Sequence, residues 1–522
     1  MKELIQSGKA VLGIEFGSTR IKAVLIDSDN RPIAQGNHEW ENRFENGLWT
    51  YSLEDIWSGL QSCYSELRKD VRERYGAEIH RLAAIGISGM MHGLMPFDRE
   101  GKLLTPFRTW RNTNTGEAAA ILSRLLNFNI PLRWSISHLY QAILDKEPYV
   151  EKIDFITTLA GYVHRKLTGE KVVGLDEGSG IFPVDPSTCS YDSSMLDKME
   201  TLLKDSGCPL QIRSLLPKTL TAGAHAGNLT PEGALLIDPE GTLQAGIPFC
   251  PPEGDAGTGM VATDAVRPGT GNVSAGTSSF SMIVLDKNLT RPYDIIDIVT
   301  TPDGKPVAMV HCNNCTSDLN AWIGIFKESL ALFGLRPDTS ELFGKLYNIA
   351  MEGDPDCGGL TGYNFVSGEP IVDVAEGKPL VFRKAADRFS LANFMRMHLY
   401  SAMACLKIGN DVLFNEEGIK IERLMAHGGF FKTPGVGQRI LAAALDCPVS
   451  VMETAGEGGA WGMALLAGYM VNNPENLTLP DYLDRQVFAG SSSHTLEPDG
   501  VDRAGFETFM QRYITNLPLE RQ

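Results

Sequence analysis

The sequence lacks the features that mark membrane, secreted and nucleic-acid-coating proteins. No apolar run approaches the roughly 18 residues of a membrane helix, and the stretch from Met1 to Gly8 lacks the core of a signal peptide. Nine cysteines, an odd number scattered from Cys63 to Cys447, do not form a disulfide framework. The net charge of −17 argues against a surface that coats nucleic acid. We therefore expect a cytoplasmic protein with neither membrane nor nucleic-acid partners.

A Walker A phosphate loop is also missing. The glycine-lysine pairs, such as Gly101-Lys102 and Gly344-Lys345, are not followed by serine or threonine. A nucleotide would therefore have to bind in another way. What is present is the composition of an ordinary globular protein, with 43% hydrophobic and 21% charged residues. A chain of 522 residues is too long for a single core, so two large domains are expected.

Two related stretches organise the chain. Gly17-Ser18-Thr19 forms a tight turn between strands expected at 11–16 and 21–26, and Gly276-Thr277-Ser278 repeats the pattern about half a chain later. Aligning Gly17 with Gly276 also aligns Asp27 with Asp286. The repeat predicts two related lobes that face each other across a cleft. Turns of glycine and hydroxyl residues suit the binding of a phosphate.

The remaining pattern predicts an α/β protein. A helix begins after Ser52 with one apolar face, and the strand expected at 83–88 follows it. Further helices are expected at 319–333, 389–414, 438–445 and 456–467, and a strand at 423–426. The glycines of the helix at 456–467 indicate close packing or approach to a ligand. Proline and glycine residues before the second turn predict a domain boundary, with lobes at 1–258 and 259–475 and a tail at 476–522 packed on the second lobe.

Five motifs occur in an order that resembles the FGGY family of carbohydrate kinases, part of the actin/hexokinase/Hsp70 superfamily. They are the two hairpins, Ser88-Gly89-Met90-Met91-His92-Gly93, Glu253-Gly254-Asp255-Ala256-Gly257 and Gly428-Gly429. The resemblance runs from residue 10 to about residue 470. It implies two related actin-like ATPase lobes of the ribonuclease H-like type with a central interdomain cleft. It also implies transfer of the γ-phosphoryl group of ATP to a primary hydroxyl of a small sugar, with Mg²⁺.

On the nucleotide side, the resemblance assigns the ATP phosphates to Gly17-Ser18-Thr19 and Gly276-Thr277-Ser278, and the adenosine to Gly428 and Gly429. Glu15 stands where the family usually has an aspartate near the magnesium ion. A carboxylate at a strand end suits a hard cation, often through water. The alternative for each hairpin is a purely structural turn. His427 occupies the first place of the family's usual glycine triplet and receives no role.

On the sugar side, the resemblance makes Asp255 the catalytic base and a substrate contact. Sugar phosphorylation needs a carboxylate within hydrogen-bond reach of the attacking hydroxyl. The alternative is an aspartate that makes a turn beside glycine. Met91 and His92 correspond to a pair that contacts the sugar in xylulokinases. Trp110-Arg111-Asn112 lie where the family has an aromatic residue followed by polar substrate contacts, with a buried core tryptophan as the rival interpretation.

Different residues of the sequence favour different sugars as the substrate. Met91-His92 favours a ketopentose, as in D-xylulose kinases, but these enzymes usually have asparagine where Ala256 follows the base, and Asp-Ala is more typical of L-ribulose kinases. We expect D-xylulose ahead of L-ribulose, with other polyols or sugar acids behind. A catalytically silent sugar sensor of the same fold is the alternative from a different class. Whether the chain acts as a monomer or a homodimer stays open. Cys312 and Cys315 carry half of a zinc-site spacing, and no zinc is expected.

Overall fold

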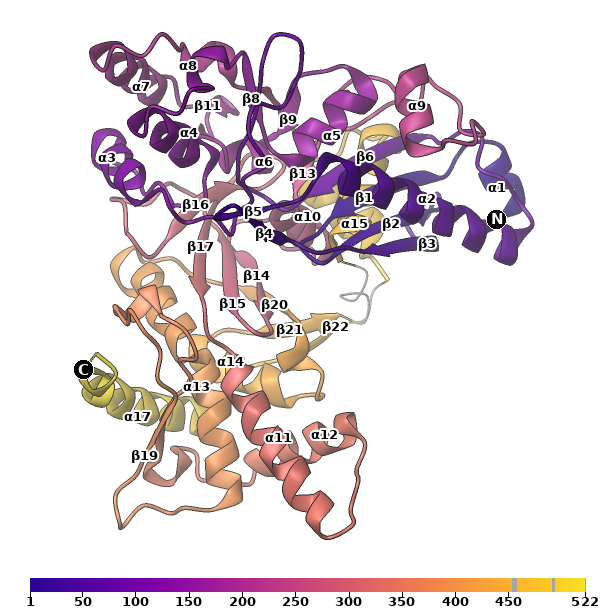
Figure 1. Cartoon of the computed structure of the whole chain (residues 1–522). Coiled ribbons are helices and arrows are strands. Elements are labelled where there is room, and N and C mark those ends of the chain that lie inside the picture. Colours follow the sequence, from indigo (N-terminus) through magenta and orange to yellow (C-terminus); the bar gives the residue numbers. More distant parts are fainter. Residues whose placement is uncertain (453–457, 491–492, 522) are drawn as a thin grey trace.

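The computed structural model describes residues 1–452, 458–490 and 493–521. Its first sheet has the strand order β3-β2-β1-β6-β13. Strands β1, β6 and β13 are parallel to one another, and β2 is antiparallel to both of its neighbours, β1 and β3. The strands are β1 (Val11–Phe16), β2 (Arg20–Ile26), β3 (Pro32–Glu39), β6 (Ala84–Gly89) and β13 (Glu253–Gly254). This sheet organises the first lobe, in indigo to magenta in Figure 1.

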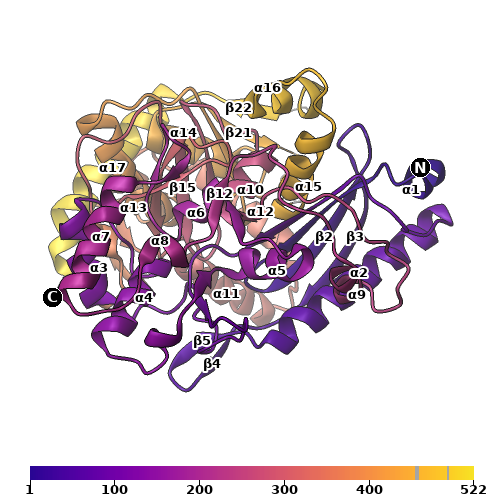
Figure 2. The same cartoon turned by 90° about the horizontal axis from the view of Figure 1, so that it is seen from above.

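Helices cover the first sheet, and a helical insertion extends from it. The long helix α2 (Leu53–Tyr75) begins at its predicted cap, where Ser52 accepts a hydrogen bond from the amide of Asp55, and it runs beside β2 and β3 in Figure 2. The remaining helices of this part are α1 (Lys2–Gln6), α3 (Gly116–Leu126), α4 (Ser135–Leu144), α5 (Leu159–Thr168), α6 (Leu175–Ser179), α7 (Ser193–Asp205), α8 (Ile212–Leu215), α9 (Pro231–Ile237) and α10 (Asp255–Ala262).

Short two-stranded ribbons link these helices. Their strands are β4 (Arg43–Glu45) with β5 (Leu48–Thr50), β7 (Met95–Phe97) with β8 (Phe155–Thr157), β9 (Val172–Gly174) with β12 (Lys218–Leu220), and β10 (Val184–Asp185) with β11 (Ser190–Tyr191). The ribbon β9–β12 leads directly into α6, because Gly174 is both the last residue of β9 and the cap of α6.

The second sheet repeats the first. Its central strands have the order β17-β15-β14-β20-β21, with β16 and β22 added at the two edges. The strands are β14 (Thr270–Ala275), β15 (Ser279–Val284), β16 (Asp297–Thr300), β17 (Pro306–Cys312), β20 (Arg423–His427), β21 (Val449–Met452) and β22 (Ser493–Leu496). As in the first lobe, a hairpin opens the sheet and a parallel strand follows beside its first strand. The predicted repeat is confirmed.

The alignment of the two hairpins differs from the sequence expectation by one residue. Leu12 pairs with Leu25 in the first sheet, and the equivalent Gly271 pairs with Ile283 in the second. The second turn is therefore one residue tighter than the first. Asp27 consequently corresponds to Leu285, and the predicted match of Asp27 with Asp286 is wrong.

The second lobe carries its own helices, shown in pink to orange in Figure 1. They are α11 (Ser317–Leu332), α12 (Thr339–Ala350), α13 (Leu391–Asp411) and α14 (Val436–Leu445), with a ribbon of β18 (Thr361–Tyr363) and β19 (Leu380–Phe382). Cys312 and Cys315 are buried in the apolar core of this lobe. After α15 (Gly458–Val471), α16 (Leu479–Tyr482) packs near the first lobe, where the Tyr482 hydroxyl donates to Asn30. The last helix, α17 (Gly500–Asn516), packs on the second-lobe core.

Helix α15 comes late in the chain but covers the sheet of the first lobe. A Cβ on Gly13 of β1 would lie 2.2 Å from the carbonyl oxygen of Ala460, and a Cβ on Gly462 would lie 2.0 Å from that of Thr258. These glycines let the backbones of β1, α15 and α10 touch. The close packing predicted for this helix is confirmed. Its predicted first residues, Gly456 and Glu457, lie outside the described residues.

Candidate active site

The carboxyl ends of three parallel strands bring the predicted catalytic residues together. Register pairs Glu15 of β1 with Ser88 of β6, and Gly89 of β6 with Gly254 of β13. Asp255 follows β13 directly, and the amide of Met91 donates to Asp255 Oδ1 at 3.3 Å. Ligands of α/β proteins bind at this edge of a sheet. The structure therefore places the predicted base beside a predicted sugar contact.

Asp255 is the first residue of α10 and is half-buried. Burial raises the pKa of its carboxyl to about 6, while hydrogen bonds from the amides of Met91 and Ala256 act in the opposite direction. A carboxyl with this pKa is mostly ionised at pH 7, yet it is more basic than an exposed aspartate. Such a group can accept a proton from a hydroxyl.

Glu15 lies against the first turn of α15. Its Oε2 accepts a hydrogen bond from the amide of Ala460 at 3.2 Å, and a Cβ on Gly459 would lie 2.4 Å from its Oε1. Burial, followed by the nearby charge of Asp255, raises the pKa of Glu15 to about 7, and the amide of Ala460 and the charge of Lys22 oppose this. Neighbouring carboxylates whose pKa values are raised in this way favour a bound cation.

The donors available fit a magnesium ion that keeps most of its shell outside the protein. Magnesium prefers oxygen ligands and is usually held by one or two carboxylates together with phosphate and water. Within residues 1–452, 458–490 and 493–521, no group of three or more histidine, cysteine or acidic side chains could enclose a metal. Glu15 is therefore a candidate for one protein contact, and its part in metal binding stays a prediction.

His92 adopts a left-handed backbone with φ of 72°, followed by Gly93 with φ of 78°. This turn stacks the imidazole on Trp134, with 6.2 Å between the ring centres, and brings Nδ1 to 3.4 Å from the carbonyl oxygen of Gly180. Burial, and then the charge of Arg133, holds the pKa of His92 well below its usual value, so the ring is neutral. With Nδ1 donating to Gly180, Nε2 can accept from a hydroxyl. Its contact with the sugar stays a prediction.

Trp110 is joined to the first hairpin, because its indole Nε1 donates to Ser18 Oγ at 3.1 Å. Arg111 is exposed and its guanidinium lies 3.9 Å from the ring centre of Trp49. Asn112 is buried, and its amide group bonds to both backbone groups of Trp49 and to the carbonyl of Thr109. This anchors the segment to β5. Substrate contact by these residues stays a prediction, and the geometry favours anchoring for Asn112.

The carbonyl groups of the first hairpin are held by donors from elsewhere in the lobe. Trp40 Nε1 donates to the Gly17 oxygen at 2.7 Å, and the Tyr51 hydroxyl donates to the Ser18 oxygen at 2.6 Å. The backbone amide of Trp40 donates to the Thr19 oxygen. A turn fixed through its carbonyls is well suited to present its amides and hydroxyls to an anion.

The second hairpin is held in the same manner. The amide and hydroxyl of Thr316 both donate to the Gly276 oxygen, at 3.0 and 2.8 Å, and the amide of Cys315 donates to the Thr277 oxygen. The loop from β17 to α11 supplies these donors, whereas aromatic side chains supply most of them in the first lobe. The two predicted phosphate turns are thus held by hydrogen bonds in both lobes, from different kinds of donor.

Gly428 passes directly beside the second hairpin. It has φ of 105°, and a Cβ at this position would lie 2.4 Å from the carbonyl oxygen of Ala275. Only glycine fits such a position. Gly429 faces open space, since a Cβ there would have no described atom within 4 Å. His427 is half-buried at the end of β20, and burial lowers its pKa. The role of both glycines at the adenosine stays a prediction.

Sequence reasoning missed several polar residues that support the site. Ser88 Oγ lies 3.1 Å from Thr258 Oγ1, which joins the end of β6 to α10. Asp176 and Glu253 are fully buried acids beside the loop that carries Asp255. In the sequence, Asp176 and Glu177 directly follow the apolar run at 172–175. This pair was an available signal, because acidic side chains are rarely buried without a role.

Family comparison identifies the chain. Residues 10–261 match the N-terminal domain, and residues 271–471 the C-terminal domain, of the FGGY family of carbohydrate kinases. The chain belongs to this family. It is a carbohydrate kinase with ATP as phosphoryl donor, and the predicted two-lobed actin-like fold is confirmed. None of the helices in the described ranges combines the length and apolar character of a membrane span.

The similar proteins include kinases that are named for different substrates. The chain is 22% identical to a xylulose kinase of Haemophilus influenzae over 97% of this chain and 99% of that protein. It is 23% identical to a glycerol kinase of Trichodesmium erythraeum over 93% and 95% of the two chains. The crystal structure of a xyloylose kinase from Brucella ovis superposes with a TM-score of 0.78 at 19% identity, covering 98% and 99% of the two chains.

Proposed function

We propose that this FGGY kinase phosphorylates a ketopentose at its terminal primary hydroxyl, converting D-xylulose to D-xylulose 5-phosphate. The observation that carries the proposal is the hydrogen bond from the Met91 amide to Asp255, since it joins the segment of the expected sugar contacts Met91 and His92 to the proposed base. Similarity to a xylulose kinase over nearly the whole of both chains supports the same substrate class.

In the proposed reaction, the ionised carboxylate of Asp255 accepts a hydrogen bond from the primary hydroxyl and orients its oxygen. That oxygen forms a bond to the γ-phosphorus, the bond from this phosphorus to the β,γ-bridging oxygen breaks, and ADP leaves. The hydroxyl proton passes to Asp255. Because the transition state of phosphoryl transfer is loose, orientation and charge stabilisation contribute more than proton removal. Gly17-Ser18-Thr19 and Gly276-Thr277-Ser278 hold the phosphates from the two lobes.

A magnesium ion, with Glu15 as a protein contact, would neutralise charge on the phosphate oxygens. Closure of the lobes would exclude water, so that ATP is not hydrolysed in place of sugar phosphorylation. In the neutral ring of His92, Nε2 would accept from a sugar hydroxyl, while Met91 would cover an apolar edge of the sugar.

Ala256 favours L-ribulose as the second candidate substrate. This residue follows the base and is half-buried at the start of α10, so its size affects the space beside Asp255. The Asp-Ala pair resembles L-ribulose kinases of the family, whereas D-xylulose kinases usually have asparagine here. Ala256→Asn should therefore raise the preference for D-xylulose over L-ribulose if this residue selects the sugar.

The test is ADP release with Mg-ATP across D-xylulose, L-ribulose, D-ribulose, L-xylulose, glycerol and gluconate, with Asp255→Ala as the control for contaminating kinases. We expect the highest kcat/KM for D-xylulose. A higher value for L-ribulose would assign the second candidate, and a higher value for glycerol or gluconate would overturn the ketopentose proposal. A folded protein that binds ATP but turns over no member of the panel would favour the silent sensor.

A further inference from the structure

A side chain of the short helix α6 accepts hydrogen bonds from the backbone around Asp255. Asp176 Oδ2 accepts a hydrogen bond from the amide of Gly257 at 3.0 Å, and the amide of Gly254 also bonds to this carboxylate. A Cβ on Gly254 would lie 2.7 Å from Asp176 Oδ2, and one on Gly257 would lie 2.5 Å from the same atom. Asp176 thus holds the backbone on both sides of Asp255.

A second buried carboxylate holds α6 in return. Glu253, at the end of β13, accepts a hydrogen bond at Oε2 from the amide of Glu177 at 3.2 Å and another from the amide of Asp176. Its carboxyl occupies the space that a side chain at Gly174 would need, since a Cβ there would lie 2.0 Å from Glu253 Cδ. We call Asp176 and Glu253 the carboxylate clasp. Asp176 accepts from an amide in the first turn of α10, and Glu253 accepts from amides in the first turn of α6.

Burial of the two carboxyl groups of the clasp is unfavourable for the stability of the fold. Asp176 and Glu253 are fully buried, and burial together with neighbouring acids raises the pKa of both. The acidic groups that face Asp176 are Asp255 on α10, Glu253 on β13 and Glu177 on its own helix. Buried carboxyl groups destabilise a protein unless their contacts compensate. Their hydrogen bonds go to backbone amides that flank Asp255 and α6, which points to a role in aiming the base.

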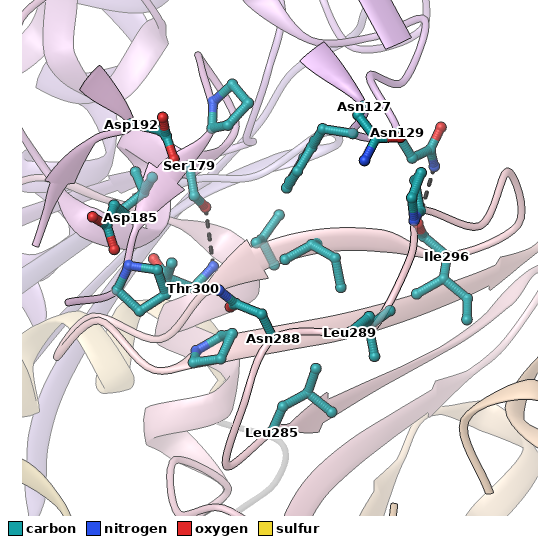
Figure 3. Close-up of a pocket in the computed structure, with 18 of the residues that line it drawn as sticks. Asn127, Asn129, Ser179, Asp185, Asp192, Leu285, Asn288, Leu289, Ile296 and Thr300 are labelled. Atoms are coloured by element: carbon teal, nitrogen blue, oxygen red, sulfur yellow. Dashed lines mark hydrogen bonds between the residues drawn. The ribbon is translucent and has the colours of Figure 1, made fainter. Parts of the chain in front are cut away.

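The other end of α6 is bonded to the second lobe. Ser179 Oγ donates to the carbonyl of Asp176 at 2.6 Å and accepts from the amide of Thr300 on β16 at 3.1 Å. Figure 3 shows this bond on the wall of a cavity of about 220 Å³. Segments 127–129 and 179–195 of the first lobe, and 285–306 of the second, line this cavity. The clasp is therefore continuous with a contact between the lobes.

We propose that Asp176 and Glu253 are positioning residues that aim Asp255 at the attacking hydroxyl, and that the Ser179–Thr300 bond links this alignment to the position of the second lobe. The inference rests on the proposed function, in which Asp255 is the base. The clasp touches neither sugar nor ATP in this scheme and acts through the backbone of β13 and α10.

The decisive experiment compares Asp176→Ala with Asp176→Asn in the full chain, using the sugar that the wild-type protein phosphorylates best. Asp176→Ala removes the acceptor for Gly257, and a base displaced by about 1 Å should lower kcat by about 100-fold. The KM values for ATP and sugar should stay within about threefold, because His92 and the two phosphate turns are not displaced. Asp176→Asn keeps an acceptor oxygen of the same shape and should restore kcat to within about fivefold of wild type.

Glu177→Gln is the matched control, because it lies on the same helix and is equally buried, but among the described residues its carboxylate oxygens have no hydrogen-bond partner on α10 or elsewhere. It should leave kcat near the wild-type value. Ser179→Ala is a second variant that removes only one oxygen. The loss of its bonds should lower kcat several-fold at unchanged KM, because each hydrogen bond contributes about 1 kcal/mol.

The results separate the inference from the proposed function. Absence of sugar phosphorylation by the wild-type protein would overturn the proposed function. An active wild type with normal kcat in Asp176→Ala would overturn only the clasp, as would a loss of kcat in Glu177→Gln as large as that in Asp176→Ala. If Asp176→Ala does not fold, as judged by circular dichroism and its Tm, Ser179→Ala decides, and a wild-type kcat in that variant would contradict the link to the second lobe.

Discussion

The two lobes have the same sheet order but present different chemistry at equivalent strand ends. Glu15 of β1 corresponds to Ser274 of β14, and their parallel neighbours are Ser88 and His427. The first lobe adds Asp255 at the end of β13 and so brings together two acids whose pKa values are raised, Glu15 and Asp255. The second lobe presents hydroxyl groups and the glycines that follow His427. Under the proposed function, one fold would serve the sugar and the base in the first lobe and the adenosine in the second.

The lobes also differ in what stabilises their hairpins. Indole and phenol groups hold the first turn, and backbone and hydroxyl groups from a neighbouring loop hold the second. The aromatic donors of the first hairpin also belong to the apolar core, because Trp40 and Tyr51 stack with 4.1 Å between their ring centres. The comparison shows that both turns are fixed through their carbonyl groups, although different kinds of residue supply the donors.

The largest expected effect tests whether catalysis belongs to the first lobe alone. Asp255→Ala removes the base, and kcat should fall about 10³-fold, within the range for general base catalysis. ATP binding, measured by calorimetry, should stay close to wild type because the expected nucleotide contacts lie in the two hairpins and at Gly428 and Gly429. Near-normal phosphorylation by this variant would remove Asp255 as the base and break the division of labour between the lobes.

The next effect tests the second lobe, with a matched pair of neighbouring glycines. Gly428→Ala places a Cβ against the Ala275 carbonyl at a backbone angle that alanine rarely adopts, so the hairpin must shift. Such strain costs about 1–3 kcal/mol, and we expect the KM for ATP to rise about tenfold or more. Gly429→Ala meets open space and should change little. Steady-state kinetics with varied ATP measures both, and equal effects would contradict the assigned packing.

The dependence on pH sharpens the comparison further, because Glu15 and Asp255, the two candidate-site acids with raised pKa values, belong to the first lobe. Asp255 must be ionised to act as the base, and its pKa is about 6. The value of kcat/KM for the sugar should therefore fall about tenfold for each pH unit well below 6. A flat profile between pH 5 and pH 7.5 would show that no group with this pKa controls the reaction.

Stability should change in the opposite direction to activity. The folded pKa of Glu15, about 7, lies above its unfolded value, so protonation favours the folded state. This contribution is fully present below about pH 4.5 and is lost as the pH rises through 7. Glu15→Gln should remove it, so the Tm of the wild type should fall relative to the variant between pH 5 and pH 8. A constant difference in Tm would contradict the raised pKa.

The smallest effects compare the two hairpins directly. Trp110→Phe removes the donor to Ser18 Oγ, and Thr316→Val removes the side-chain donor to Gly276 while the backbone amide remains. Loss of one such bond costs about 1 kcal/mol, so each change should raise the KM for ATP by about threefold to fivefold. A larger effect of Trp110→Phe on the KM for the sugar would favour the predicted stacking of Trp110 on the substrate.

Local patterns predicted much of this structure. The Gly-Ser/Thr turns were recognisable because a tight hairpin requires small residues, and the helix after Ser52 because its cap and apolar face are both local. The one-residue difference between the hairpins was not predictable, since a turn can tighten while its sequence still resembles the first. The path of α15 was also missed. Its sequence indicates close packing but does not say which sheet receives it.

The sequence by itself determined that two related lobes form, that each begins with a tight hairpin, and that Asp255 lies in a segment rich in glycine and proline between them. These properties depend on neighbours along the chain. Only the tertiary structure decided that Glu15 meets the first turn of α15 and that Asp176 and Glu253 hold the backbone around Asp255. Such contacts join residues far apart in sequence, and buried acids become favourable only where a particular fold supplies amides to receive them.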